Sequence, residues 1–111
     1  MEIITKEEKN YKTYILLYEK TSYIEFVIDK DLKSCTITNI LVEINKRNKG
    51  IGTILLKKCF EICDKKVKYY ELDDMSCRWN KCNNIYKKFG FTYLYIENGV
   101  AIGPEMIKNC N

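Results

Sequence analysis

Hydrophobic and polar residues follow a strand-like pattern in the first part of the chain. Three runs rich in aromatic and β-branched residues are separated by short polar segments, and each run favours a β-strand. The pattern predicts three antiparallel strands, at residues 11–19, 23–28 and 35–44. In the third strand, alternate side chains are expected to share one face: Thr36, Thr38, Ile40 and Val42.

After residue 52 the pattern changes to that of a helix. Apolar side chains recur three or four positions apart through residues 53–65, and polar residues occupy the remaining face. Residues 67–74 return to strand composition, and a strand–helix–strand connection of this length makes that strand parallel to the one before it. The apolar stripe expected to face the sheet consists of Ile51, Leu55, Leu56, Cys59, Phe60, Ile62 and Cys63.

The C-terminal part is predicted to add a short helix at residues 80–88 and then a hairpin. Asn98-Gly99 is a strong signal for a tight turn between strands at residues 91–96 and 100–107. Pro104, which cannot donate a backbone hydrogen bond, is expected at an edge or a bulge. Together the elements predict a mixed α/β (α+β) fold in a single domain, residues 1–111.

Composition agrees with this fold and narrows the class of partner. Of the 111 residues, 46% are hydrophobic and 31% are charged, as in a globular protein. The net charge of +4 is spread over turns and helix faces, so we expect an anionic small ligand and no nucleic acid. No apolar run has the length of a membrane span, and residues 1–8 lack the zones of a signal peptide. We therefore expect a cytoplasmic, intracellular protein that does not bind membranes.

The six cysteines do not form paired Cys-x-x-Cys knuckles, and the chain has no histidine. Structural zinc sites are usually built from such pairs, so we expect no bound metal. Free and mostly buried thiols in a reducing compartment are the expected state.

The segment Arg47–Gly52 joins the third strand to the first helix and has the composition of an anion-binding loop. Two glycines allow close approach of a ligand to the backbone, and the first amides of the helix have no partner within it. The helix dipole and the nearby Lys46, Arg47 and Lys49 favour a diphosphate there. A P-loop would need Gly-Lys-Ser/Thr, and a dinucleotide fingerprint would need a third small residue where Leu55 stands.

Arg47-Asn48-Lys49-Gly50-Ile51-Gly52 resembles the pyrophosphate loop of the GCN5-related N-acetyltransferase (GNAT) superfamily, Arg/Gln-x-x-Gly-x-Gly/Ala. The resemblance extends to Ile40-Leu41-Val42 upstream and to the run from Ile85 to Phe91 downstream. It implies the GNAT fold, a mixed and mostly antiparallel sheet with splayed central parallel strands and flanking helices. It also implies acetyl-CoA as cosubstrate and transfer of its acetyl group to a primary amine, by direct attack in a ternary complex.

The resemblance further implies positions for the cofactor. The strand end would hold the pantetheine amides, the loop amides would hold the pyrophosphate with two basic side chains as charge partners, and nearby asparagines would bind coenzyme A (CoA). The cofactor-binding residues implied are Leu41, Val42, Glu43, Arg47, Asn48, Lys49, Gly50, Ile51, Gly52, Thr53, Asn80, Asn83 and Tyr86.

Tyr86 stands four residues before Gly90, where many GNAT enzymes carry the tyrosine that protonates the leaving thiolate. The alternative is a core tyrosine on a helix face. For the base, Asp73 and Asp74 end a strand near the expected splay, and either could accept the proton of the amine directly or through water. A backbone carbonyl with a water chain is a third route.

Two departures from the family support a second hypothesis. The family usually has two helices between its first two strands, whereas here only residues 6–10 could form a helical turn. Positions where some members carry carboxylates hold Thr36, Thr38 and Asn39. The chain is therefore either an N-acetyltransferase or a CoA-binding sensor or interaction module without catalysis, and a small basic nucleic-acid-binding domain is a weaker third reading. The late strands are candidates for a homodimer edge.

Overall fold

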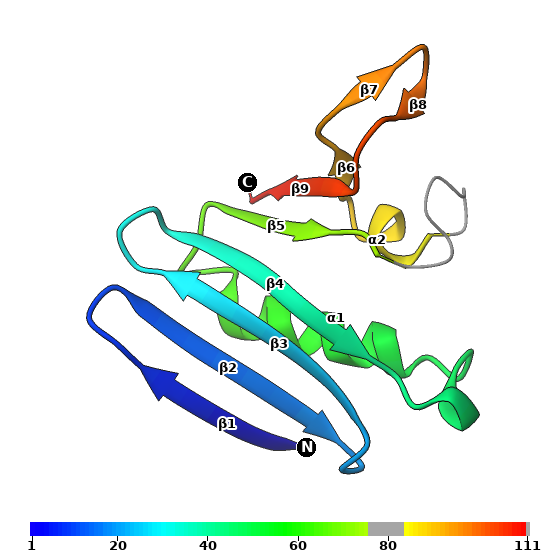
Figure 1. The fold of residues 1–111 in the computed structure, drawn as a ribbon. Helices are drawn as coiled ribbons and strands as arrows, with labels where there is room; N and C mark the ends of the chain where they lie inside the picture. Colours follow the sequence, from blue (N-terminus) through cyan, green and yellow to red (C-terminus); the bar gives the residue numbers. More distant parts are fainter. Residues whose placement is uncertain (76–83, 111) are drawn as a thin grey trace.

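The computed structural model describes residues 1–75 and 84–110, and its order of elements agrees with a GNAT fold (Figure 1). The seven-stranded sheet has the order β1-β2-β3-β4-β5-β9-β6. The first four strands pair antiparallel and are β1 (Glu2–Glu7), β2 (Tyr11–Tyr18), β3 (Ser22–Asp29) and β4 (Ser34–Leu41). The three strands predicted from the alternation are thereby confirmed as β2, β3 and β4.

The ends of this region differ from the sequence analysis in two ways. Residues 6–10, which could have formed a helical turn, do not, because Lys6 and Glu7 belong to β1 and pair with β2. At the other end the predicted strand 35–44 is too long, since β4 stops at Leu41 and a short 3-10 helix, η1 (Ile44–Lys46), follows it. Strand β1 escaped detection because all six of its residues are exposed, so its pattern shows no buried face.

A bulge in β4 changes which side chains face the core. Between its pairs with Glu25 and Phe26 of β3, β4 contains one extra residue. Because side chains alternate along a strand, this residue reverses their direction beyond it. The face expected from simple alternation is therefore wrong, since Ile40 and Val42 pack against the core whereas Thr36 lies on the opposite face.

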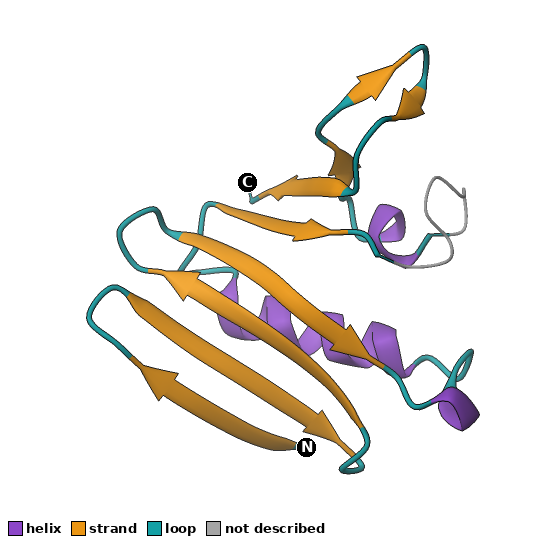
Figure 2. Cartoon of the chain, in the orientation of Figure 1, coloured by secondary structure: helices purple, strands orange, loops and turns teal. Residues whose placement is uncertain are grey.

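Helix α1 (Ile51–Cys63) covers one face of the sheet, behind β2, β3 and β4 in the view of Figures 1 and 2. The predicted stripe is confirmed, because all its members are buried except Ile62, which is partly buried against the same core. Strand β5 (Tyr69–Asp73) pairs parallel to β4 as predicted, from Ser34–Tyr69 to Ile37–Leu72. Beyond these four pairs β4 continues without a β5 partner, so the two strands diverge.

The chain after residue 83 forms α2 (Ile85–Lys88), inside the predicted helix 80–88, whose first residues lie outside the described part. Strand β9 (Glu105–Asn109) then pairs with β5 on one side and with β6 (Thr92–Tyr93) on the other. The β5–β9–β6 arrangement extends the sheet past the point of divergence.

The predicted Asn98-Gly99 turn is confirmed, because both residues have positive φ (54° and 78°) between β7 (Ile96–Glu97) and β8 (Val100–Ala101). The two long strands expected beside it are wrong. The first is interrupted at residues 94–95, between β6 and β7, and the second at the bend of residues 102–104, between β8 and β9. Pro104 lies in that bend, where its carbonyl accepts a hydrogen bond from the backbone of Asp74 (2.7 Å).

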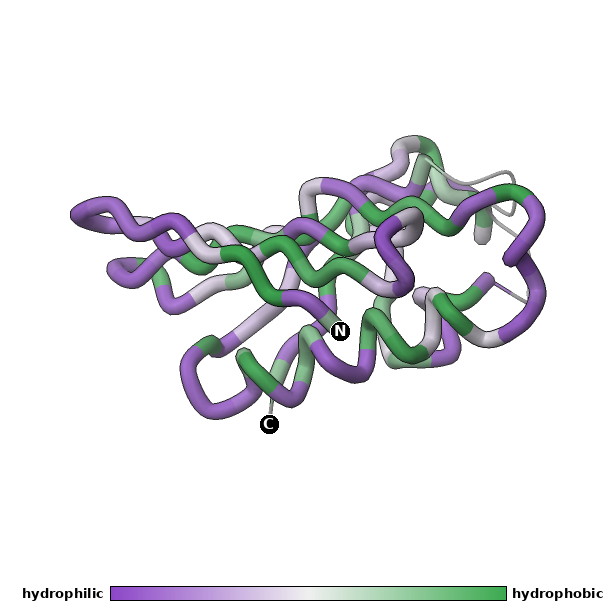
Figure 3. The backbone as a smooth tube through the Cα atoms, turned by 90° about the horizontal axis from the view of Figure 1, so that it is seen from below, coloured by the Kyte–Doolittle hydropathy of each residue, from purple (hydrophilic) through white to green (hydrophobic). Residues whose placement is uncertain are grey.

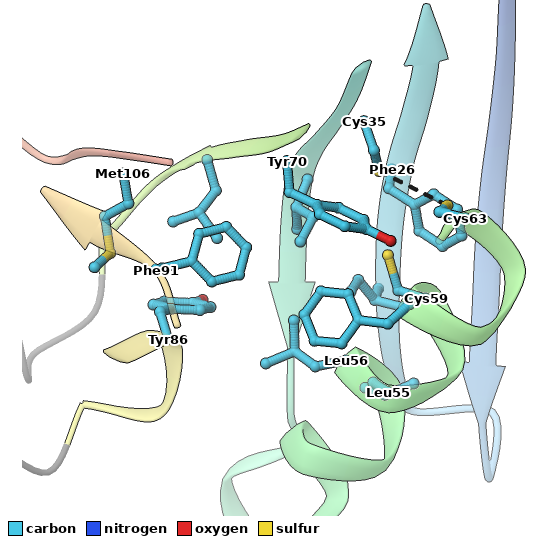
Figure 4. Close-up of a cluster of buried hydrophobic side chains, with 14 of the residues drawn as sticks. Phe26, Cys35, Leu55, Leu56, Cys59, Cys63, Tyr70, Tyr86, Phe91 and Met106 are labelled. Carbon is cyan, nitrogen blue, oxygen red and sulfur yellow. Dashed lines mark hydrogen bonds between the residues drawn. The ribbon is translucent and has the colours of Figure 1, made fainter. Parts of the chain in front are cut away.

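The core lies between the sheet and α1 and continues toward α2 (Figure 4). Phe60 of α1 contacts Tyr70 and Phe91 with ring centroids 5.0 and 6.3 Å apart. The turns that end the β1–β2 and β3–β4 hairpins are hydrophilic, whereas the strand centres are hydrophobic (Figure 3). Among the described residues, neither helix has the length and apolar composition that a membrane crossing requires.

The core predicts a contrast between two leucine-sized positions on α1. Leu56 is completely buried, whereas Ile54 is 41% exposed on the same helix. We expect Leu56→Ala to lower the free energy of unfolding by about 3 kcal/mol, since a cavity adds to the lost burial, and Ile54→Ala to lower it by less than about 1 kcal/mol. Urea unfolding followed by circular dichroism measures both, and equal losses would contradict this core.

Candidate functional site

A groove of about 770 Å³ opens where β4 and β5 diverge. One wall is the free edge of β4, the floor is the start of α1, and the other wall comes from the end of β5 and from α2. It gathers ten of the residues predicted from sequence: Leu41, Val42, Arg47, Asn48, Gly50, Ile51, Gly52, Thr53, Asp73 and Tyr86. Glu43, Lys49 and Asp74 do not line it, and Asn80 and Asn83 lie outside the described residues.

The start of α1 is built to leave its first amides available. The cap residue of the helix is Gly50, which has the left-handed conformation (φ 81°). The first turn therefore receives no hydrogen bond from a capping side chain. The first intrahelical bond runs from the amide of Ile54 to the carbonyl of Gly50 (3.0 Å), so the preceding amides have no partner within the helix. With the positive end of the helix dipole at the same point, this turn can bind an anion.

Gly52 has a different role from Gly50. A Cβ atom at Gly52 would lie 3.3 Å from Cδ1 of Ile85 and 4.0 Å from Cγ2 of Val42, whereas at Gly50 it would meet nothing within 4 Å. Gly52 therefore allows α2 and the strand end to pack closely on α1. Gly50 supplies a backbone conformation that other residues adopt at a cost.

The basic residues near the loop divide into two groups. Arg47 lines the groove, and its Nε donates to the carbonyl of Val42 (3.1 Å). Lys46 instead turns away to Glu19 and Glu43, with nitrogen–oxygen distances of 3.0 and 3.5 Å. Lys88 of α2 lines the groove and was not singled out from sequence. Two basic residues, Arg47 and Lys88, therefore border the groove.

Part of the expected backbone surface for pantetheine is already engaged. The carbonyl of Val42 accepts from Arg47, and the amide of Glu43 donates to Oγ of Ser22 (3.1 Å). The edge of β4 that faces the groove without a β5 partner is instead residues 38–41. The resemblance implied residues 41–43, whereas the strand pairing leaves residues 38–41 without a β5 partner.

Tyr86 lies on the groove wall formed by α2, with only 7% of its surface exposed. Its ring packs edge-on against Phe91, with centroids 6.1 Å apart (Figure 4). Burial and, secondarily, the negative charge of Asp74 raise the pKa of Tyr86 to about 12. The hydroxyl is therefore protonated at neutral pH, as a proton donor requires.

The two adjacent aspartates at the end of β5 differ in surroundings. Asp73 is exposed and lines the groove. Asp74 is 2% exposed, and its Oδ2 accepts hydrogen bonds from Nδ2 of Asn84 (2.6 Å) and from the hydroxyl of Tyr93 (2.7 Å). Neighbouring residues of a strand point to opposite faces, so only Asp73 is directed to the groove.

The other groove residues were not assigned to the site from the sequence, although Ile40 and Ile85 lie in the motifs of the resemblance and Thr38 and Asn39 stand where some members carry carboxylates. They are apolar or small polar side chains whose position depends on the divergence of the strands, namely Ile37, Thr38, Asn39, Ile40, Leu72, Met75 and Ile85. The strand pairing, which brings distant segments together, reveals them.

A group that could hold a metal lies elsewhere in the core. Cys35, Cys59 and Cys63 are free and fully buried, which confirms the prediction for these three, and their sulfur atoms lie within 4.8 Å of one another. Within the described residues this group offers three ligands, one fewer than a structural zinc site holds. None of the three lines the groove.

Comparisons with known proteins agree with this architecture. A family model described as an acetyltransferase (GNAT) domain matches residues 9–93. No curated protein matches the sequence. GCN5 from Tetrahymena has a similar structure, with a TM-score of 0.67 and 19% identity over 94% of this chain and 71% of its own.

Two further solved structures share the fold. PaiA N-acetyltransferase from Thermoplasma acidophilum, in complex with coenzyme A, gives a TM-score of 0.61 at 18% identity, over 89% of this chain and 59% of its own. PH1933 from Pyrococcus horikoshii gives a TM-score of 0.63 at 25% identity, over 92% of this chain and 66% of its own. The chain thus spans between 59% and 71% of the length of these three structures.

The buried Tyr86 predicts a specific loss of stability at high pH. A tyrosine in the unfolded chain has a pKa near 10, whereas folding raises the pKa of Tyr86 to about 12. The stabilisation from this group is therefore complete below pH 10 and is lost as the pH rises toward 12. We expect it to amount to up to about 3 kcal/mol, and Tyr86→Phe to remove this part of the alkaline loss. Urea unfolding across the window, with the exposed Tyr11→Phe as control, measures the difference.

Proposed function

The chain belongs to the GNAT acetyltransferase family, and from this premise we propose that it transfers an acetyl group from acetyl-CoA to a primary amine. The acceptor is a small amine or a protein lysine or N-terminus. One observation carries the proposal. A single groove is bordered by an uncapped helix start that suits a diphosphate and by the buried, protonated hydroxyl of Tyr86.

The cofactor would lie along the groove. Its pyrophosphate would accept hydrogen bonds from the amides of residues 48–53, with Arg47 and Lys88 as charge partners. Its pantetheine arm would pair with the free edge of β4 at residues 38–41, the stretch that β5 does not cover. This course would run from the start of α1 toward Tyr86.

The reaction needs a proton acceptor for the amine and a proton donor for the thiolate. In our proposal the amine nitrogen attacks the thioester carbon, the carbon–sulfur bond breaks, and Tyr86 gives its hydroxyl proton to the leaving sulfur. Asp73, the exposed carboxylate in the groove, takes the proton of the amine directly or through water. Asp74 is buried in other hydrogen bonds, so we do not assign the base to it.

Binding is tested by two glycines with matched backbone strain. Gly50 (φ 81°) and Gly99 (φ 78°) both have open space around a would-be Cβ, but only Gly50 lies in the groove. The left-handed conformation costs an alanine about 1–2 kcal/mol more than a glycine. In Gly50→Ala the loop should therefore change conformation and turn its amides away from the phosphates. We expect CoA to bind about tenfold more weakly to Gly50→Ala, and unchanged to Gly99→Ala, by calorimetry. No heat of binding to the wild-type protein would reject the proposed cofactor.

Catalysis is tested by removing one oxygen. Tyr86→Phe deletes the proton donor and keeps the ring against Phe91. We expect kcat for thiol release, with acetyl-CoA and a panel of amines, to fall by about a hundredfold or more while CoA affinity stays the same. Tyr95→Phe, 55% exposed, is the control. CoA binding by the wild-type protein without turnover of any amine would instead support the sensor or interaction module.

A further inference from the structure

Asp74 is the centre of a buried polar cluster behind the groove wall. Its Oδ2 accepts hydrogen bonds from Nδ2 of Asn84 (2.6 Å) and from the hydroxyl of Tyr93 (2.7 Å). The three residues are 2%, 0% and 7% exposed. The cluster therefore ties the end of β5 to the start of α2 and to β6 in a region from which water is excluded.

Asn84 connects this cluster to Tyr86. It is the cap residue of α2, and its Oδ1 accepts from the backbone amides of Tyr86 (2.8 Å) and Lys87 (3.4 Å). A side-chain amide has one oxygen and one nitrogen end, so the bond from Nδ2 to Asp74 directs the oxygen toward the helix. A helix of one turn is not stable alone, and its position must come from such contacts.

We propose that Asp74 is a positioning residue for acetyl transfer: through Asn84 it fixes the start of α2 and with it the place of Tyr86 in the groove. The inference rests on the proposed role of Tyr86 as proton donor. It replaces the role of base that the sequence suggested for Asp74.

The charge of Asp74 gives this arrangement a readout in the titration of Tyr86. Burial is the main cause that raises the pKa of Tyr86 and the charge of Asp74 is the second. Burial alone disfavours the phenolate, and a carboxylate nearby disfavours it further because like charges repel. Other charged side chains border the groove, α2 or its neighbours, namely Arg47, Asp73, Lys87, Lys88 and Lys108.

Two variants separate the effect of the charge of Asp74 from the effect of its hydrogen bond to Asn84, which holds the start of α2. Asp74→Asn keeps the shape and an oxygen that can accept, and removes the charge. Asn84→Ser keeps an oxygen that can cap the helix and removes the bond to Asp74. Asp31→Asn, in the exposed turn between β3 and β4, is the control for loss of one negative charge.

The first measurement does not need turnover. In the full chain labelled with 13Cζ-tyrosine, the resonance of Tyr86 is identified by its disappearance in Tyr86→Phe and followed against pH. We expect its midpoint in Asp74→Asn to lie about one unit below that of the wild-type protein, and to be unchanged in Asp31→Asn. Equal midpoints in the wild-type and Asp74→Asn proteins would overturn the electrostatic role.

The second measurement separates this inference from the proposed function. We expect Asn84→Ser to fold and to lose about tenfold in kcat, with the KM for acetyl-CoA within about twofold of wild type, because only the donor is displaced. If the wild-type protein turns over, and both variants have the same kcat and the same Tyr86 midpoint as wild type, the positioning role is overturned. The proposed function is then unaffected. A wild-type protein without turnover rejects the function, and the Tyr86 midpoint in Asp74→Asn then decides whether Asp74 acts on that hydroxyl.

Discussion

The divergence of β4 and β5 is the constraint on which the rest of the structure depends. The two strands pair in parallel over four positions and then separate, at the point where β4 carries its bulge. A bulge adds twist and bends its strand, so β4 turns away from β5 while remaining paired with β3. The gap that results exposes backbone groups of β4 in the middle of a sheet, where a neighbouring strand would otherwise cover them.

The elements that follow the two strands use this gap in complementary ways. Helix α1 begins at the end of β4 and presents free amides and positive dipole charge at one end of the groove. Helix α2 follows β5 and presents a buried hydroxyl on the other wall. Gly52 keeps the two helices close, since a side chain there would press on Ile85. The start of α1 and Tyr86 are thereby held at a fixed separation by packed secondary structure.

The polar cluster around Asp74 lies in an otherwise apolar region. Burying a carboxylate is unfavourable unless hydrogen bonds compensate, and Asn84 and Tyr93 supply two of them. Such a cluster has fewer satisfactory arrangements than an apolar core of equal size, so it can specify the place of a short helix. On the opposite side of the molecule, β1 joins β2 directly, and no described helix lies on the face of β1–β4 away from α1 (Figures 1 and 2).

The sequence by itself determined the features that depend on neighbouring residues. The apolar stripe of α1 follows from helical spacing, the Asn98-Gly99 turn from residues that tolerate positive φ, and the uncapped start of α1 from a glycine at a strand-to-helix junction. The tertiary structure alone decided the bulge in β4, the break before Pro104, the burial of Asp74 and the exposure of Asp73. Local preference cannot distinguish two adjacent aspartates, because their surroundings come from Asn84, Tyr93 and the groove, which only folding brings to the end of β5.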